Sequence, residues 1–215
     1  MAYSISKFIL SPILRLWLGK MSGLENIPEG MPFIIAANHS SYYETLLLPS
    51  IILLKVNKPI HGFVGSSYYK MFLTRFFLNL WGGIPVYVKK EKNAKKKNKD
   101  SMELASNYLK KGHIITIFPE GQRSYDGKLK KAYNGVARLA LLSKTPVLPI
   151  GVIGSNEVLP KGKLFPRFAR CKVKIGKLIY FSKYYDKKIS DKQLQQVTRI
   201  IMKEIAKLIN QEYNY

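Results

Sequence analysis

The stretch Phe33-Ile-Ile-Ala-Ala-Asn-His-Ser-Ser-Tyr-Tyr-Glu44 decides how the rest of the sequence is interpreted. An apolar, strand-like run ends at Asn38 and His39, and the acidic residue Glu44 follows five residues after the histidine. Histidine is a suitable general base near neutral pH because its unperturbed pKa is ~6.5. It needs a partner that fixes its tautomer and stabilises the imidazolium. The stretch therefore makes His39 a candidate base and Glu44 its candidate partner.

Glu44 has two competing interpretations. On a regular helix, five residues at about 100° each would turn Glu44 roughly 140° away from His39. The pair can therefore meet only if His39 lies in a strand-to-helix turn and Glu44 points back from the first helical turn. In the other interpretation, Ser41 and Glu44 form a Ser-x-x-Glu capping box. Taken alone, the stretch favours the capping box, because short motif matches are often accidental.

Composition and charge restrict the class of protein. The chain has 215 residues, of which 47% are hydrophobic and 23% charged, so a single globular domain is expected. Its 36 Lys and Arg against 13 Asp and Glu give a net charge of +23, which favours an anionic partner such as lipid, nucleic acid or an acidic protein. One cysteine, Cys171, excludes an internal disulfide framework and a Cys-based zinc site, and fits a reducing compartment.

The N-terminal residues predict an amphipathic helix. Over residues 3–18, polar side chains recur at helical spacing and apolar side chains cover the rest, but the segment is too short to span a bilayer. It is either a core-packing helix or an interfacial helix, and Trp17 together with the basic residues favours the membrane. We expect residues 1–22 to associate with a membrane and residues 23–215 to form the main domain. Residues 67–81 are apolar on nearly all sides and should be buried or touch lipid.

The remaining pattern predicts an α/β fold with a mixed, largely parallel central sheet flanked by helices. A helix is expected after His39, and Pro49 must kink or end it. Further helices are expected from Asp100 to Gly112, through Ala132 to Ala140, and from a capping box at Ser190. The basic run 89–99 is expected to be a solvated loop. Strands are expected at residues 32–37, 60–64, 82–88, 114–118, 147–152, 172–175 and 178–181.

Four sequence blocks lie at the ends of expected strands, where α/β folds build their sites. They are Asn38-His39…Glu44, Gly82-Gly83-Ile84-Pro85-Val86, Phe118-Pro119-Glu120-Gly121-Gln122-Arg123-Ser124 and Val147-Leu148-Pro149-Ile150-Gly151-Val152. In this order and composition the sequence resembles the glycerolipid acyltransferase family, which includes 1-acyl-glycerol-3-phosphate acyltransferase. The resemblance covers residues 24–155 and is most specific in the third block.

The resemblance implies a reaction and a set of residues. A fatty acyl group would move from acyl-CoA or acyl carrier protein to the free hydroxyl of 1-acyl-glycerol-3-phosphate, giving phosphatidic acid, with His39 as general base oriented by Glu44. No cofactor or metal is implied. The other residues, all implied to bind substrate, are Asn38, Gly83, Ile84, Pro85, Lys90, Glu120, Gly121, Arg123 and Ser124.

Two departures from the family pattern leave alternatives open. The family's acid is usually Asp, and the second block normally carries an arginine where this sequence has Val88; Lys90 is the better substitute, because alternate residues of a strand share a face. The acceptor is therefore either lysophosphatidic acid or another lysophospholipid or glycerol-based molecule, unless the chain is a catalytically silent membrane-binding homologue. A nucleic-acid partner is disfavoured, because the lysines lie without aromatic interleaving. We expect peripheral or monotopic attachment to an anionic membrane on its cytoplasmic side, and a structural or solvated role for His61 and His113.

Overall fold

The computed structural model describes residues 11–88, 90–185 and 188–215. Its centre is a seven-stranded sheet in the order β1-β7-β6-β2-β5-β3-β4. The five strands from β6 to β4 run parallel, whereas β7 is antiparallel to β6 and pairs in parallel with β1. The expected mixed, largely parallel α/β sheet is confirmed. The strands are β1 (Leu18–Ser22), β2 (Ile34–Ala37), β3 (Ile60–Gly65), β4 (Ile84–Val86), β5 (Ile114–Ile117), β6 (Val147–Ile153) and β7 (Cys171–Ile175).

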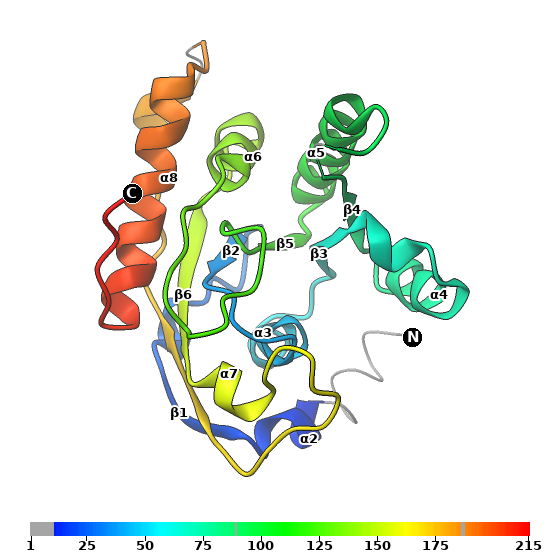
Figure 1. Ribbon diagram of the computed structural model, residues 1–215. Helices are drawn as coiled ribbons and strands as arrows, with labels where there is room; N and C mark the ends of the chain where they lie inside the picture. The colour runs from blue at the N-terminus through cyan, green and yellow to red at the C-terminus, as the bar shows by residue number, and fades with distance from the viewer. Residues whose placement is uncertain (1–10, 89, 186–187) are drawn as a thin grey trace.

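Helices cover both faces of the sheet (Figure 1). One face carries α5 (Ala94–Lys110), α6 (Gly135–Ser143) and α8 (Asp191–Leu208), and the other carries α2 (Ser11–Arg15), α3 (Tyr43–Ile52) and α7 (Ser155–Val158). The helix α4 (Phe72–Leu80) lies beside β4, away from these layers. Short 3-10 turns occupy Leu24–Asn26, Ser66–Tyr69 and Ser182–Tyr184.

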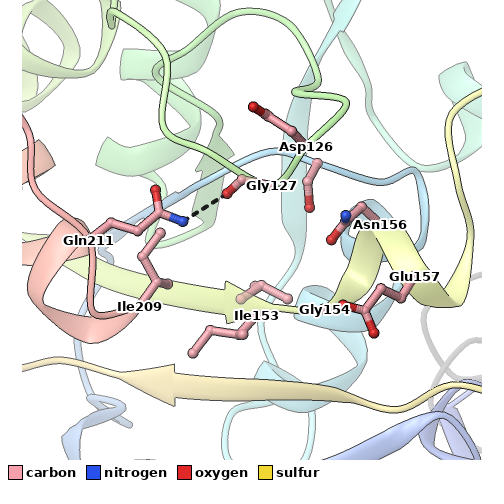
Figure 2. Close-up of a pocket in the computed structure, with 10 residues that line it drawn as sticks. Asp126, Gly127, Ile153, Gly154, Asn156, Glu157, Ile209 and Gln211 are labelled. Carbon is pink, nitrogen blue, oxygen red and sulfur yellow. Dashed lines mark hydrogen bonds between the residues drawn. The ribbon is translucent and has the colours of Figure 1, made fainter.

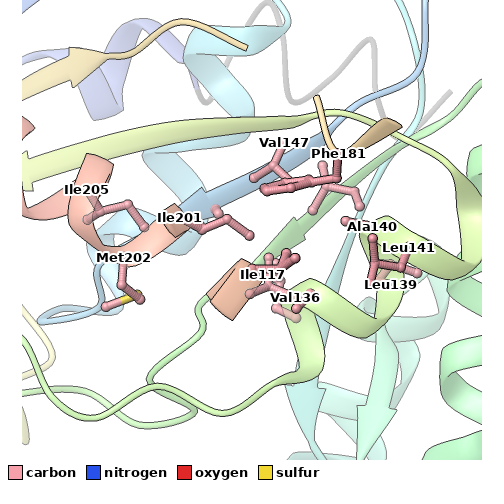
Figure 3. Packing of buried hydrophobic residues seen from close by; sticks show 14 of the residues in the cluster. Ile117, Val136, Leu139, Ala140, Leu141, Val147, Phe181, Ile201, Met202 and Ile205 are labelled. Carbon is pink, nitrogen blue, oxygen red and sulfur yellow. The ribbon is translucent and has the colours of Figure 1, made fainter. Parts of the chain in front are cut away.

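Side chains along β2 alternate between the two faces of the sheet, so a hydrophobic cluster forms on each face. Ile34 and Ala36 belong to the hydrophobic cluster under α5, α6 and α8, while Ile35 and Ala37 belong to the cluster under α2 and α3. All four side chains are fully buried, as expected for a central parallel strand that is covered on both faces. Figure 3 shows the first cluster, in which Ile201 of α8 lies between Ile205 on the same helix and the side chains of Val147 and Phe181.

Several expected boundaries were wrong. The helix α5 begins at Ala94, not at Asp100, so most of the basic run is helical; the Asn98 side chain fixes this first part by bonding both the N–H and the C=O of Tyr87 at 2.8 Å. Of the two outcomes expected at Pro49, the helix does not end there, because α3 continues to Ile52. Residues 178–181 form an isolated bridge through Ile179 instead of a strand. The strands on either side of α6 are parallel as expected, but β2 lies between them.

The capping box at Ser190 is confirmed. The Ser190 hydroxyl accepts from the Gln193 N–H, and the Gln193 side chain accepts from the Ser190 N–H, at the start of α8. Two backbone donors of the first helical turn are thereby satisfied. The start of α8 could therefore be predicted from the Ser-x-x-Gln pattern alone.

The expected helix over residues 3–18 lies partly outside the described residues, which begin at residue 11. The part that is described is helical only over Ser11–Arg15, and the chain enters β1 at Leu18. Because β1 pairs with β7, the sheet starts within the segment expected to precede the domain. Within the described ranges, no helix is both long enough and apolar enough to cross a membrane.

The helix α4 resolves the alternative left for residues 67–81. It has no buried residue, and Phe72 and Phe76 are 81% and 56% exposed. The helix is therefore not part of the core. Met71, Leu73, Phe77 and Leu80 are exposed as well.

Candidate active site

The parallel strands bring three of the four blocks to one edge of the sheet. In β2, β5 and β6 the carboxyl ends lie together, because β2 pairs in register with both neighbours. His39 follows the end of β2, Glu120 follows β5, and Ser155 follows β6. The Ser124 N–H donates to the His39 carbonyl at 2.8 Å, so the third block folds directly onto the first. This edge is where α/β sheets usually bind their ligands.

His39 and Glu44 form the pair that the sequence left open. The Nδ1 atom of His39 lies 2.8 Å from a carboxylate oxygen of Glu44, which is completely buried. Because a carboxylate only accepts, Nδ1 carries the proton and the Nε2 lone pair is left to act as a base. The imidazole also stacks on Phe118, with ring centroids 4.0 Å apart. The His39 side chain keeps 13% of its surface exposed, so solvent or a substrate reaches it.

The alternative capping box at Ser41 is not formed. The helix α3 begins after Tyr42, which provides no side-chain cap. The Ser41 hydroxyl accepts from the Tyr43 N–H at 3.1 Å and donates to the Leu159 carbonyl at 2.7 Å, rather than pairing with Glu44. Glu44 does serve the turn, but through Ser40, whose backbone N–H and hydroxyl both donate to it at 2.8–3.0 Å. The same carboxylate therefore holds the turn and the histidine.

A serine shortly after β6 completes the surroundings of Glu44. Ser155, the first residue of α7, is fully buried, and its hydroxyl donates to Glu44 and lies 2.8 Å from the Ser40 hydroxyl. Hydrogen bonds to a carboxylate stabilise its charged form, which offsets the cost of burial. Ser40 and Ser155 were missed by the sequence reasoning. Their positions are the only signal that could have pointed to them, Ser40 directly after His39 and Ser155 three residues after the fourth block.

Asn38 joins two strands. Its side-chain amide donates to the Val152 carbonyl and accepts from the Val152 N–H, both at 2.8 Å, and its side chain is buried. The two polar atoms are thus both occupied by β6. Asn38 fixes the position of His39, its neighbour, and does not present its amide to open space.

Glu120 holds the backbone of the histidine turn. One carboxylate oxygen accepts from the His39 N–H and the other from the Lys130 N–H, each at 2.8 Å. Only 1% of the residue is exposed, and burial raises the pKa of Glu120 to about 7, although the two hydrogen bonds act in the opposite direction. Its contacts are those of a positioning group.

The third block also carries Arg123. Its guanidinium lies over the ring of Tyr42, 3.3 Å from the ring centroid, and Nη1 is buried without a hydrogen-bond partner among the described residues. A planar guanidinium with a free donor fits a phosphate or carboxylate. Gly121 adopts a φ of +66°, and a Cβ there would lie 3.0 Å from the Tyr133 ring, so the turn requires glycine. Ser124 is buried.

The second block lies on and before β4, which is the outermost strand on one side of the sheet. Two strands, β5 and β3, separate β4 from β2, so at ~4.8 Å per strand the block lies about 14 Å across from β2. Ile84 is fully buried in the core, and the Pro85 carbonyl accepts from Ser101 at 2.7 Å. Both residues support the strand. Lys90 is exposed in the turn beyond β4.

The glycines of the second block are required by packing. A Cβ at Gly83 would lie 2.7 Å from the Tyr69 hydroxyl, and one at Gly82, whose φ is +65°, would collide with the His61 ring. His61 is buried and its Nδ1 lies 3.0 Å from the Gly82 carbonyl, while Nε2 lies 2.9 Å from Nδ1 of His113. Burial lowers the pKa of both histidines. The structural interpretation of His61 is thereby supported.

A small cavity lies next to Ser40, the residue that follows His39 (Figure 2). It has a volume of about 160 Å³ and is lined by Ser40, by Asp126 and Gly127 of the third-block loop, and by Asn156 and Gln211. The Gln211 side chain donates to the Gly127 carbonyl and accepts from the Leu129 N–H, both at 3.0 Å. The C-terminal residues therefore hold the third-block loop, a role that no motif indicated.

Comparison with known proteins gives a consistent result. The family model described as Acyltransferase matches residues 20–153. A 1-acyl-sn-glycerol-3-phosphate acyltransferase of Bacillus subtilis is 29% identical over 75% of this chain and 78% of its own length. A chloroplastic 1-acyl-sn-glycerol-3-phosphate acyltransferase of Brassica napus is 27% identical over 66% of this chain, which spans about two fifths (39%) of that protein.

A solved structure shares the fold. The crystal structure of the 1-acyl-sn-glycerophosphate acyltransferase PlsC of Thermotoga maritima superposes with a TM-score of 0.69 over all of this chain and 85% of that one. The sequence identity is 21%, so this likeness concerns the fold alone.

Proposed function

The chain belongs to the acyltransferase family, and we propose that it moves a fatty acyl group from acyl-CoA or acyl carrier protein to the free hydroxyl of 1-acyl-glycerol-3-phosphate, giving phosphatidic acid. The observation that carries this proposal is the buried Glu44 carboxylate 2.8 Å from Nδ1 of His39. The pair provides a base close to Arg123, whose Nη1 is buried without a hydrogen-bond partner among the described residues.

The proposed reaction needs one general base, which is a side chain of this protein. Nε2 of His39 takes the proton of the acceptor hydroxyl as its oxygen attacks the thioester carbonyl carbon, and Glu44 stabilises the imidazolium. When the tetrahedral intermediate collapses, the C–S bond breaks and the imidazolium returns the proton to the departing thiolate. General-base help of this kind is typically a factor of ~10²–10⁴ in rate.

The acceptor phosphate has one well-placed partner in this proposal. Arg123 offers Nη1, which is buried and unpaired, whereas Val88, at the position of the family's arginine, is 65% exposed and carries no charge. Lys90 is exposed two residues beyond Val88 and supplies a second cation for the phosphate or for the donor. Gly83 and Pro85 belong to the second block, about 14 Å across the sheet from β2, and would contact only a substrate that extends that far.

A second candidate function rests on Val88. Because the arginine is missing, an acceptor without a phosphate monoester, such as another lysophospholipid or a glycerol-based molecule, also fits the site. A catalytically silent homologue is less well supported, because Glu44, although one methylene longer than aspartate, reaches His39.

We also propose peripheral or monotopic attachment to an anionic membrane, on the cytoplasmic side where both acyl donors occur. The exposed apolar side chains of α4 support this, as do Ile13 and Leu16 in and after α2, which are 49% and 68% exposed. Residues 1–20 remain the expected anchor, and their deletion should release an otherwise folded protein from liposomes. Unchanged binding would contradict an anchoring role.

The decisive experiment incubates the purified protein with lysophosphatidic acid and labelled acyl-CoA or acyl carrier protein and identifies the product by mass. His39→Ala should abolish transfer while the melting temperature and membrane binding stay unchanged. Glu44→Gln keeps the shape but removes the charge, and should lower turnover at least tenfold. If His39→Ala melts far earlier than the parent, or retains its activity, the proposed mechanism is wrong.

A further inference from the structure

The loop of residues 161–170, between α7 and β7, exposes three large apolar side chains. Leu164, Phe165 and Phe168 are 88%, 82% and 111% exposed, among the highest values for apolar residues in the described part of the chain. The loop contains no helix or strand. Single exposed apolar residues are common on soluble proteins, but three within five residues form a patch that calls for a partner.

Basic residues are interleaved with the apolar ones. The loop reads Lys-Gly-Lys-Leu-Phe-Pro-Arg-Phe-Ala-Arg, and the sequence from 158 to 185 contains no acidic residue. Lys163, Arg167 and Arg170 are all exposed. Apolar tips flanked by cations complement the headgroup region of an anionic bilayer, where phosphates lie above hydrocarbon.

Two backbone hydrogen bonds hold the loop in place, one within it and one directly after it. The Arg167 N–H donates to the Val158 carbonyl at 2.7 Å, and the Cys171 N–H, directly after the loop, donates to the Trp17 carbonyl at 2.9 Å. The second contact places the end of the loop beside the residues that follow α2, as Figure 1 shows. The end of the loop therefore lies close to Leu16, which is itself 68% exposed.

The start of the loop also touches the candidate active site. The ammonium of Lys161 lies 3.8 Å from the centre of the Tyr125 ring, and Tyr125 follows the third block. The Leu159 carbonyl accepts from the Ser41 hydroxyl, two residues after His39. A membrane bound to the loop would lie next to the mouth of the site.

We propose that the 161–170 loop is a membrane-insertion element, separate from the N-terminal segment, whose Leu164, Phe165 and Phe168 side chains enter one leaflet while Lys163 and Arg167 bind anionic headgroups. A bilayer fits better than an acidic protein, because the apolar tips project into solvent without forming a groove for a defined surface. The inference does not depend on the reaction that the site catalyses.

A fluorescence experiment on the full chain tests insertion directly. The only native thiol, Cys171, is buried, so Phe165→Cys can be labelled with an environment-sensitive dye. Adding vesicles of phosphatidylcholine and phosphatidylglycerol should shift the emission to the blue and protect the dye from aqueous quenchers. The same dye at Leu142→Cys, which is exposed on α6 in the opposite helical layer, should not respond.

Vesicle partitioning measures the contribution of the loop. Lys163→Gln with Arg167→Gln should weaken partitioning roughly 30-fold, since each cation near anionic headgroups contributes a factor of about five. Exchanging Leu164, Phe165 and Phe168 for serine should weaken it at least tenfold on neutral vesicles as well. Lys192→Gln with Lys203→Gln on α8 is the matched charge control, and should have a smaller effect.

Three results would overturn the proposal. The first is a protein that binds vesicles while the dye at position 165 stays in water. The second is equal partitioning of the loop variants and the α8 control. The third is a dye that responds to acyl carrier protein but not to vesicles, which would make the loop a protein-docking surface. Each is distinct from loss of acyl transfer, which is measured separately.

Discussion

Replacing Glu120 by glutamine should change how the stability of the protein depends on pH. Burial raises the pKa of Glu120 from 4.5 to about 7, so the folded protein holds its proton over a range in which the unfolded chain has lost it. A raised carboxyl pKa contributes stability that is fully present below about pH 4.5 and is lost as the pH rises through about 7. The shift of roughly 2.5 pKa units corresponds to about 3 kcal/mol, at 1.36 kcal/mol per unit.

Glu120→Gln should therefore gain about 3 kcal/mol relative to the parent between about pH 4 and about pH 8. The amide puts an NH₂ group against either the His39 or the Lys130 N–H, which costs about 1–3 kcal/mol, but this cost is the same at every pH. Denaturant unfolding, followed by the fluorescence of Trp17 and Trp81, gives both free energies. Glu103→Gln, at a side chain that is 61% exposed, is the matched control.

A pH-independent difference between Glu120→Gln and the parent would refute the reasoning, because it would mean that the buried carboxyl titrates like an exposed one. Activity provides a second readout. Since Glu120 holds the His39 backbone, the variant should lose kcat with little change in KM even where its stability matches that of the parent. An unchanged kcat would show that the turn is positioned without this carboxylate.

Three further changes test other parts of the site. Arg123→Ala should weaken use of lysophosphatidic acid about ten- to a hundredfold and Val88→Arg should improve it; the opposite pattern in acylation assays would point to an acceptor without a phosphate monoester. Ser155→Ala removes a buried donor to Glu44 and should lower kcat about tenfold while the fold persists, whereas a large drop in melting temperature with normal kcat would make Ser155 structural only. Burial lowers the pKa of His61, so neutral His61 contributes to the free energy of unfolding above about pH 6.5, and this contribution is lost as the pH falls below that value. His61→Gln should therefore make the free energy of unfolding fall less steeply in acid. An equally steep fall in the variant and the parent would contradict the lowered pKa.

Local signals predicted the fold well where they coincide with burial. The apolar runs at β2, β5 and β6 are continuous because both sheet faces are covered, so their strands were found and their parallel direction followed from the helices between them. The order of the strands did not follow, since β2 enters between β5 and β6 without any local signal. The start of α5 was placed late, at Asp100, because a good capping residue stood inside a helix whose first turn is fixed by the Asn98–Tyr87 contact.

The candidate site shows the same division between local and long-range information. Each block could be recognised because its characteristic residues lie within seven consecutive positions. The hydrogen-bond partners of Glu44, in contrast, are up to 111 positions away from it in the sequence. The side chain of Asn38 is a good example, because a polar residue beside a histidine predicts a ligand group, while the β6 backbone, 114 residues away, bonds both of its polar atoms. A buried amide that satisfies a neighbouring strand has the same sequence signature as one that faces a substrate. Only the pairing of β2 with β6 distinguishes the two, and that pairing also brings Ser155 to the Glu44 carboxylate that bonds His39.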